Sequence, residues 1–344
     1  MTRSPFRPAL AALALAAAGS CAAQSSVSLY GLVDVAGGRF QNAGGLKTWR
    51  IDANGMSQSY LGLRVIEDVG AGLKVRVQLE HYLRPDTGTA GRYAADPFWS
   101  RSANVGFQGA FGTSLLGRNT TPLYQSAVLL SAFGDSFVFS PTLRQYFGSP
   151  PGSSLGDTIV GDIVWNNSLA YASPDYNGVA FNLIGNLGEG GLGATGRNLG
   201  GNIVYLRGPL AATVAWQQVR NGLVAPPAGF QHQNTLHLGL AYEFGPAKVF
   251  GQLGRIRTDA VTQVDTQLWQ IGSAVPIGAT GLARIAYGSR EVDSGGLTLT
   301  NRTFAIGYDH YLSKSTDLYG ALVFDRASGL ASGRTVAGGM RVRF

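Results

Sequence analysis

The chain has 344 residues and a formal net charge of +7, but only 14% of its residues are charged, against roughly a quarter in soluble domains. The basic residues are scattered singly instead of gathered in runs, which argues against a nucleic-acid-binding protein. Apolar and polar residues are finely mixed, and no apolar run of about 20 residues occurs, which argues against a helical membrane protein.

The first residues have the composition of a secretory signal peptide. Arg3 and Arg7 form a basic start, residues 9–18 form an apolar core, and small residues follow at 21–23. We therefore predict a signal peptide at residues 1–23 and an exported mature chain at residues 24–344 that begins with Gln24.

Cys21 is the only cysteine of the chain. In a lipoprotein this residue would carry the lipid, but residues 18–20, Ala-Gly-Ser, lack the leucine usual in that signal. Cleavage before Gln24 removes Cys21, so we expect a mature chain without a disulfide.

Short segments of alternating apolar and polar residues fill the mature chain. In residues 73–80, apolar Leu and Val alternate with Lys74, Arg76, Gln78 and Glu80. The same pattern occurs at residues 27–35, 236–244, 283–290 and 340–344. Alternation with a period of two predicts β-strands that have one apolar and one polar face.

The connections between these strands are of two kinds. Tight turns are predicted at residues 68–72, 109–112, 174–178, 245–246 and 312–316. Long polar connections are predicted at residues 37–55, 84–97, 187–197 and 221–233. Tight turns at one end and long loops at the other are typical of an outer-membrane β-barrel, and the segments number about sixteen.

A barrel of this kind has to close, because an open sheet edge would leave unpaired backbone groups in hydrocarbon. The apolar faces then contact lipid, and Lys74, Arg76, Gln78 and Glu80 face the interior. Sixteen strands enclose an aqueous channel. The alternative fold is a periplasmic β-sandwich, in which the two faces would be reversed.

Aromatic residues near the predicted strand ends favour the barrel, because aromatic girdles mark the two membrane interfaces. The residues concerned are Tyr30, Tyr60, Trp165, Tyr171, Trp216, Tyr242, Phe244, Trp269, Tyr308 and Phe344.

A series of motifs runs through the mature chain at residues 24–34, 67–74, 111–118, 171–174, 307–314 and 316–319, and ends with Phe344. In this order they resemble the Gram-negative trimeric general porins, especially the beta-proteobacterial type. The resemblance implies a homotrimer of 16-stranded antiparallel barrels in the outer membrane. It also implies a third loop, at about residues 121–164, that folds into the barrel and holds a short helix within 123–133. In that family the terminal aromatic, here Phe344, is recognised by the barrel-assembly machinery.

In such porins, arginines on the wall face acidic residues on the third loop. The resemblance assigns Arg101 and Arg144 to this pore constriction, and Arg64, Lys74 and Arg76 lie near by in the inferred sheet. Arg118 matches a family arginine that serves either the constriction or the subunit interface. Alternation with Val105 and Phe107 would point Arg101 outward unless a β-bulge intervenes. Each basic residue could instead be an ordinary solvated residue of the wall.

The chain departs from the family pattern at two places. Tyr60 stands where many relatives have an arginine, and Ala132 replaces a loop glutamate, for which Asp135 is a partial substitute. Loss of the carboxylate favours anions and loss of the arginine opposes this. The whole set predicts a mildly anion-selective constriction.

The sequence thus predicts passive diffusion of small hydrophilic solutes and ions, with no cofactor and no catalytic residues. The alternatives are a substrate-specific channel of the same fold and, from another class, a barrel enzyme or adhesin. The four histidines, His81, His232, His237 and His310, lack the spacing of a metal site, and no Gly-x-Ser-x-Gly motif occurs. Residues 189–196 are glycine-rich but lack the lysine of a phosphate-binding loop.

Overall fold

The computed structural model describes residues 25–148, 151, 158–186, 197–220 and 226–344. The predicted signal peptide with Cys21, and Gln24, lie outside the described residues. Most of the predicted loop at 187–197 and part of the one at 221–233 lie outside them too.

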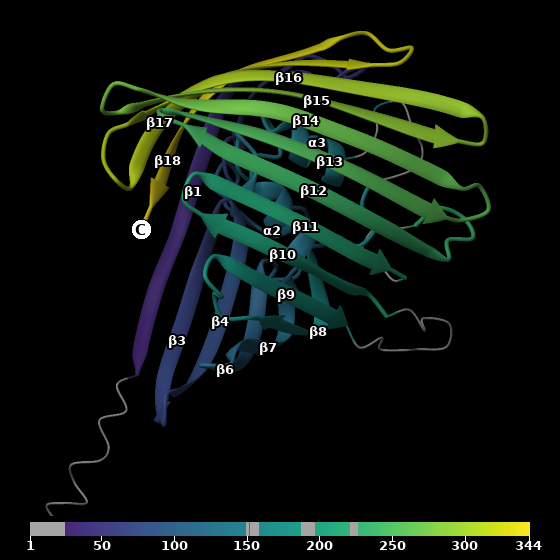
Figure 1. Ribbon diagram of the computed structural model, residues 1–344. Coiled ribbons are helices and arrows are strands. Elements are labelled where there is room, and N and C mark those ends of the chain that lie inside the picture. Colours follow the sequence, from purple (N-terminus) through teal and green to yellow (C-terminus); the bar gives the residue numbers. More distant parts are fainter. Residues whose placement is uncertain (1–24, 149–150, 152–157, 187–196, 221–225) are drawn as a thin grey trace, which may run out of the picture.

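The described residues form a closed antiparallel β-barrel of sixteen strands (Figure 1). Two further short strands, β2 (Thr48–Ala53) and β5 (Thr89–Ala90), extend the connections at the loop end. The barrel strands are β1 (Ser26–Phe40), β3 (Tyr60–Gly70), β4 (Leu73–Arg84), β6 (Ser102–Gly109), β7 (Gly112–Thr120), β8 (Val164–Ala172), β9 (Val179–Asn186), β10 (Leu199–Arg207), β11 (Leu210–Val219), β12 (His232–Phe244), β13 (Ala247–Asp259), β14 (Val264–Ile277), β15 (Gly281–Ser294), β16 (Leu297–Tyr311), β17 (Thr316–Ala327) and β18 (Gly333–Arg343).

Strand β1 closes the barrel, because it pairs with both ends of the sheet. Its first half pairs with β3 from Ser26 to Leu32, and its second half pairs with β18 from Leu32 to Arg39. Beyond β18, the backbone N–H of Gly31 donates to the carbonyl of Phe344 at 2.9 Å, and the N–H of Phe344 donates to that of Gly31 at 3.1 Å. Closure therefore leaves the barrel without the open edge that a bilayer forbids.

The alternation expected from the sequence is present in the strands. Along β17, Asp317, Tyr319 and Asp325 are buried on the inner side, whereas Leu318 and Leu322 are exposed on the outer side. All five predicted tight turns join neighbouring strands at one end of the barrel, and the predicted β-sandwich alternative is excluded.

The aromatic residues divide between the two faces. Trp216, Tyr242, Phe244, Trp269, Tyr308 and Phe344 are exposed on the outer face, as a girdle requires. The expectation was wrong for Tyr30 and Tyr60, which face the interior, and for Trp165, which is buried and donates its indole N–H to the carbonyl of Gly161 at 2.7 Å. Trp165 lies where β8 meets the third loop, so it packs on that loop instead of reaching lipid.

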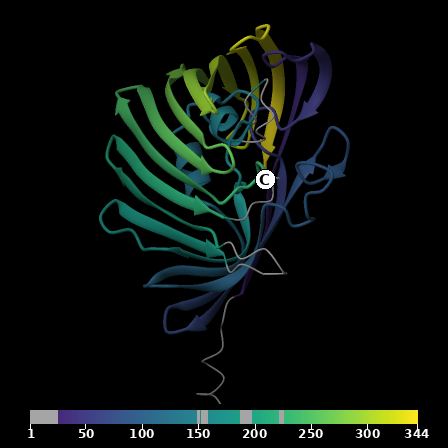
Figure 2. The same cartoon turned by 90° about the vertical axis from the view of Figure 1, so that its right-hand side faces the viewer.

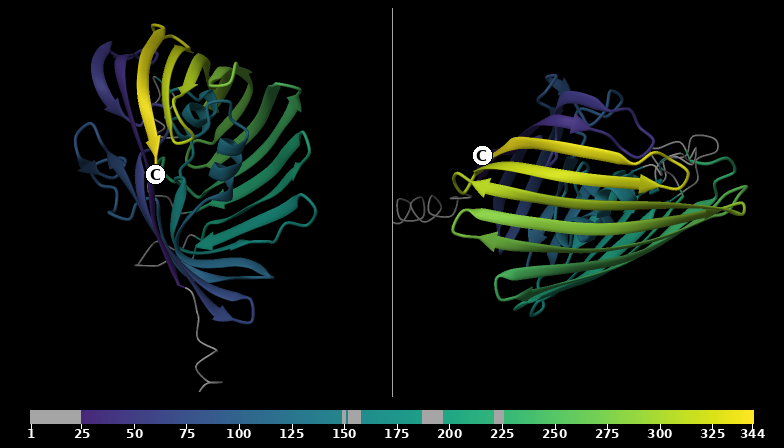
Figure 3. Two further views of the ribbon diagram at one scale, coloured as in Figure 1. Left: turned by 90° about the vertical axis from the view of Figure 1, so that its left-hand side faces the viewer. Right: turned by 90° about the horizontal axis from the view of Figure 1, so that it is seen from above.

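The described residues of the segment between β7 and β8, namely 121–148, 151 and 158–163, fold into the barrel and are called the third loop (Figures 2 and 3). It contains α2 (Pro122–Leu129), which overlaps the expected helix, and a second helix, α3 (Pro141–Phe147). Thr121 and Ser140 cap these helices by accepting backbone hydrogen bonds, and each is followed by proline at the first helical position, which suits the helical φ.

This third loop packs against one half of the wall, because the inner face there carries small residues. The helices contact β9–β12 and β14–β16. Loop residues Leu130, Phe133 and Phe139 form one apolar cluster with a set of inward alanines, namely Ala211, Ala241, Ala274, Ala286, Ala305, Ala321 and Ala337. Most of the apolar packing of the loop therefore lies on this half. The inner face of β1, β3, β4 and β6, which the loop touches at Tyr60 and Tyr82, is the freer side of the lumen.

Glycines of the wall allow the closest contacts between the wall and the loop. A Cβ added at Gly254 on β13 would lie 2.0 Å from Oη of Tyr146 in α3, whereas Gly251 on the same strand has no atom within 4 Å of an added Cβ. We expect Gly254→Ala to destabilise the folded barrel by about 1–3 kcal/mol through overpacking. Gly251→Ala is the matched control and should be neutral. Thermal unfolding of the two refolded variants measures the difference, and equal transitions would show that Tyr146 moves aside without cost.

Candidate functional site

Two arginines on the free side of the wall lie diagonally across neighbouring strands. Arg64 on β3 is opposite Gln78 of β4, and Arg76 of β4 is opposite Ile66. The guanidinium of Arg64 lies 4.8 Å from the ring centroid of Tyr30, and Arg76 donates a hydrogen bond to the side chain of Gln78. Within the described residues neither arginine has an ion pair, so both leave positive charge at the lumen surface.

Arg101 lies beside them and faces inward. Its Nε is 3.1 Å from Oε2 of Glu80, and its guanidinium lies 4.1 Å from the ring centroid of Tyr60. Tyr30 donates its hydroxyl to the other oxygen of Glu80 at 2.7 Å. The outward direction expected from alternation was wrong, because Arg101 precedes β6, which begins at Ser102, so no bulge is needed.

The third loop places one carboxylate near this group. Oδ2 of Asp135 accepts a hydrogen bond from the backbone N–H of Gln58 at 3.4 Å, and Tyr60 lies within electrostatic range of both Asp135 and Arg101. Ala132 is fully buried against the wall, where its Cβ is 3.0 Å from the position of a Cβ at Gly272. A glutamate at 132 would not fit in this packing.

Three of the predicted residues lie apart from this group. Lys74 is exposed beside the tight turn, opposite Asp68. Arg144 in α3 forms an ion pair of 3.1 Å with Asp325 of β17, which ties the loop to the far wall. Arg118 shares the outward face of β7 with Leu116, but it is buried, and its Nε donates to the carbonyl of Ser100 at 2.8 Å.

Further charged pairs on the inner face were not singled out from the sequence. Arg284 lies 2.7 Å from Asp309 and also donates to the carbonyl of Ala132 at 2.5 Å, and Arg341 lies 3.0 Å from Asp317. The sequence does indicate that both arginines face inward, since each occupies a polar position of an alternating segment. It does not indicate their acidic partners, because these lie on neighbouring strands whose register only the structure shows.

A polar recess of about 240 Å³ opens beside the arginines. It lies between the wall and the start of α2 and is lined mainly by amide and hydroxyl side chains together with one guanidinium. Its polar residues include Arg76, Gln78, Asn104, Asn119, Gln125 and Asn182. Such a surface can exchange hydrogen bonds with a hydrated solute that passes along it.

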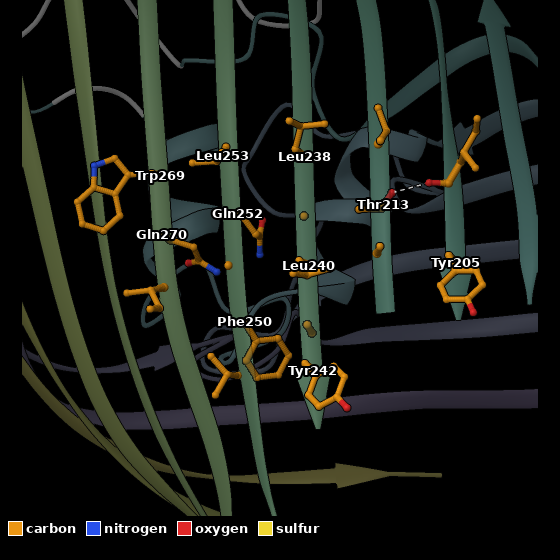
Figure 4. A pocket seen from close by; sticks show the side chains of 18 of the residues that line it. Tyr205, Thr213, Leu238, Leu240, Tyr242, Phe250, Gln252, Leu253, Trp269 and Gln270 are labelled. Atoms are coloured by element: carbon orange, nitrogen blue, oxygen red, sulfur yellow. Dashed lines mark hydrogen bonds between the residues drawn. The ribbon is translucent and has the colours of Figure 1, made fainter. Parts of the chain in front are cut away.

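A groove of about 790 Å³ on the other side of the sheet is apolar (Figure 4). Leu238, Leu240, Leu253 and Trp269, which line it, are exposed on the outer face, and outward-facing Gly251 leaves space among them. This groove belongs to the lipid-facing surface and takes no part in the lumen.

A clamp joins the connection at residues 85–101 to the base of the third loop. Arg92 lies 2.9 Å from Asp96 and 2.7 Å from Asp162. Burial alone would raise the pKa of Asp96, but hydrogen bonds and charge from Arg92, with the more distant Arg118, outweigh it and lower the pKa. The clamp therefore holds a charged carboxylate at neutral pH.

No helix of the described residues is long and apolar enough to span a membrane. Among the same residues, no three or more His, Cys, Asp or Glu side chains are grouped so that they could hold a metal ion.

A closed barrel with an apolar outer face, a polar and charged inner face and a loop inside the lumen defines a pore-forming protein of the membrane. The chain matches the family model of the Gram-negative porins over residues 9–330, and it belongs to this family. It is thus an outer-membrane porin.

Three similar proteins place the chain among known porins and porin-like barrels. The chain is 30% identical to outer membrane porin protein 32 of Delftia acidovorans, with 93% of this chain and 89% of the relative covered. The solved structure of an anion-selective porin from Comamonas acidovorans matches with a TM-score of 0.79 at 28% identity, over 93% of this chain and all of that one (100%). A loop-deletion mutant of OmpT from Vibrio cholerae matches with a TM-score of 0.74 at 14% identity, over 93% and 99% of the two chains, which shows the fold alone.

The clamp predicts a pH dependence of the connection at 85–101. Because the pKa of Asp96 is lowered, its carboxylate stabilises the clamp above the ordinary pKa of about 3.9, and this contribution is lost as the pH falls through the lowered value. We expect the backbone amides of residues 91–96 and 98–100 to be protected from hydrogen exchange at pH 7 and to lose protection below about pH 4.

Arg92→Gln should abolish that protection at pH 7, whereas Arg84→Gln, which removes an arginine without an ion pair in the described chain, should retain it. Protection in Arg92→Gln equal to that of the wild type would contradict a role for the ion pairs.

Proposed function

We propose that this porin is a passive diffusion channel for small hydrophilic solutes and ions, that it prefers anions, and that it has no catalytic activity. The observation that carries the proposal is the pair of lumen-facing arginines, Arg64 and Arg76, for which the described residues provide no ion pair. Uncompensated positive charge along a narrow aqueous path raises the local concentration of anions.

Within its described residues, the third loop has one carboxylate, that of Asp135, without an ion pair to oppose them. Its acidic residues are Asp135, Asp157 and Asp162. Asp162 is paired with Arg92, Asp157 lies outside the described residues, and Asp135 accepts a backbone hydrogen bond. The solved relative from Comamonas acidovorans is described as anion-selective, which supports the same preference here.

Current across a planar bilayer that contains the refolded protein, under a KCl gradient, tests the proposal. Discrete steps with a reversal potential of the sign for chloride are expected. Steps with the opposite sign would overturn the anion preference, and conductance that saturates with one particular solute would favour a substrate-specific channel instead. A folded barrel without steps would overturn the channel itself.

Substitution of the wall arginines predicts a graded change in selectivity. Arg76→Ala and Arg101→Ala each remove one positive charge, and a unit charge about 8 Å from the path in water changes the ion distribution by about twofold. Because the anion concentration falls and the cation concentration rises by that factor, the chloride-to-potassium permeability ratio should fall about fourfold in each variant.

Arg255→Gln is the control for these two variants, because Arg255 is exposed on the outer face of β13. Unchanged ratios in both alanine variants would remove Arg76 and Arg101 from the constriction. A change in Arg255→Gln as well would attribute the effect to overall charge.

The homotrimer is likewise our proposal. The resemblance implies it, and the connection at 85–101 supports it, because this segment leaves Tyr93, Phe98 and Trp99 exposed by 45%, 61% and 36%. Phe98 also stacks on His81 at 4.2 Å between ring centroids. Since His81 occupies an outward position of β4, the segment overlies the outside of the barrel there, where a neighbouring subunit would cover its aromatic rings.

We therefore expect Phe98→Ser with Trp99→Ser to shift the protein from trimer to monomer in native mass spectrometry. Val261→Ser, which changes an isolated side chain exposed by 82% in another loop, should leave the trimer intact. A stable trimer in the double variant would place the interface elsewhere.

Phe344 is proposed as the signal for the barrel-assembly machinery. Two backbone hydrogen bonds to Gly31 also give it a local role in closure. Deletion of Phe344 should lower the yield of assembled protein in cells at least severalfold and should impair refolding into detergent much less. An equal loss in both settings would assign Phe344 to closure alone, and normal yields in both would remove it from assembly.

A further inference from the structure

The polar recess beside Arg76 has the size of a small solute. It lies on the inner face of β4 and of β6–β9, and Pro122 and Gln125 at the start of α2 line it from the side of the third loop. Its volume of about 240 Å³ is the space of about eight water molecules at about 30 Å³ each. A single sugar ring with its hydroxyl groups fits into this space.

Several polar side chains of the recess have hydrogen-bonding capacity left over. Within the described residues, the side chains of Thr113, Thr120 and exposed Gln125 make no hydrogen bond. Asn104 is buried, and its Nδ2 donates to the carbonyl of Arg118 at 3.2 Å, but its Oδ1 has no partner. Buried polar groups are normally hydrogen-bonded, so the recess calls for partners from a solute or from water.

The chemistry of these groups favours an uncharged solute with several hydroxyls. Arg76 is the one charged side chain among the described residues of the lining, and it already donates to the side chain of Gln78. Amides and hydroxyls both donate and accept hydrogen bonds. An inorganic anion or a simple carboxylate only accepts, so it would leave acceptors such as Oδ1 of Asn104 unpaired at a cost. A polyhydroxylated solute can satisfy donors and acceptors alike.

The recess also offers an apolar surface. Leu115, Ala170, Ala172 and Ile184 belong to its lining and lie on the inner faces of β7, β8 and β9. A sugar ring has a face of C–H groups and an edge of hydroxyls, so it can pack on these apolar side chains while its edge reaches the amides. Apolar lining with a few placed polar groups is the usual composition of a small-molecule site.

We infer that this recess binds a neutral monosaccharide. The inference rests on the proposed diffusion channel, because the recess opens beside the water-filled path. A sugar bound there replaces water next to Arg76 and narrows the path for ions. The channel thereby holds a weak stopping place for sugars on the side of the lumen that the third loop leaves freer.

Saturation-transfer NMR of D-glucose with the detergent-purified protein tests the site without relying on ion current. The wild type should show saturable binding. In Q125L/T113V, two side chains without hydrogen bonds in the described chain lose their polar groups at similar size. The dissociation constant should rise about 25-fold, since each lost hydrogen bond weakens binding about fivefold. Q125N, which keeps a shorter amide, should bind with intermediate affinity.

S28A is the matched control, because Ser28 is exposed on the inner side of β1, opposite Arg64, and does not line the recess. It should bind glucose like the wild type. Unchanged affinity in Q125L/T113V would overturn the site, as would an equal loss in S28A. D-Glucuronate differs from glucose by one carboxylate, and tighter binding of glucuronate would overturn the neutral class and assign an acid to Arg76.

Current across a planar bilayer separates this site from the proposed channel. Glucose should lower the single-channel current in a saturable way in the wild type and in S28A, and about 25-fold more glucose should be needed in Q125L/T113V. Glucose binding by NMR without any current would overturn the channel and leave the site standing. Normal current without glucose binding would overturn the site alone.

Discussion

The structure depends on the packing of one loop against small residues of the wall. The described residues of the third loop can enter the barrel because the inner face of β11–β18 presents alanine and glycine. At Gly239 and Gly307, an added Cβ would approach Leu130 and Phe133 of the loop to 2.5 and 3.0 Å. The loop buries its own apolar side chains there, so it satisfies hydrophobic packing inside a barrel whose lumen is otherwise polar. Which half of the wall carries the small residues thus decides where the water-filled path runs.

The charges differ in part between the two halves. On the half that supports the loop, Arg144 pairs with Asp325 and Arg284 pairs with Asp309. On the free half Arg101 pairs with Glu80, whereas Arg64 and Arg76 have no ion pair within the described residues. Pairs beneath the loop hold it in place, whereas unpaired charges beside the path act on passing ions. An arginine has a different role on each side, although its side chain is the same.

Much of the fold could be predicted from the sequence, because alternation and turn residues are local signals. The strand at 73–80 and the tight turns follow from them, whereas the loop bounds near Thr121 and Val164 came from the resemblance to the porins. The site was harder to predict from the sequence. Arg101 precedes its strand, so the alternation of the strand predicted the wrong direction for its side chain. Arg118 is covered by a distant segment that no local pattern connects to it. Helix α3 is short, and its place is decided by contacts with the wall, which periodicity does not reveal.

The shared pairing of β1 has a consequence for the order in which the chain folds. This strand binds its sequence neighbour β3 through one half and the last strand β18 through the other. The first contact is local, but the second joins opposite ends of the chain and has a large loop-closure entropy to overcome. Until β18 is synthesised and translocated, half of β1 has no partner on that side. The nascent sheet must therefore be shielded at two edges at once, and the final seam is formed by the residues that emerge last.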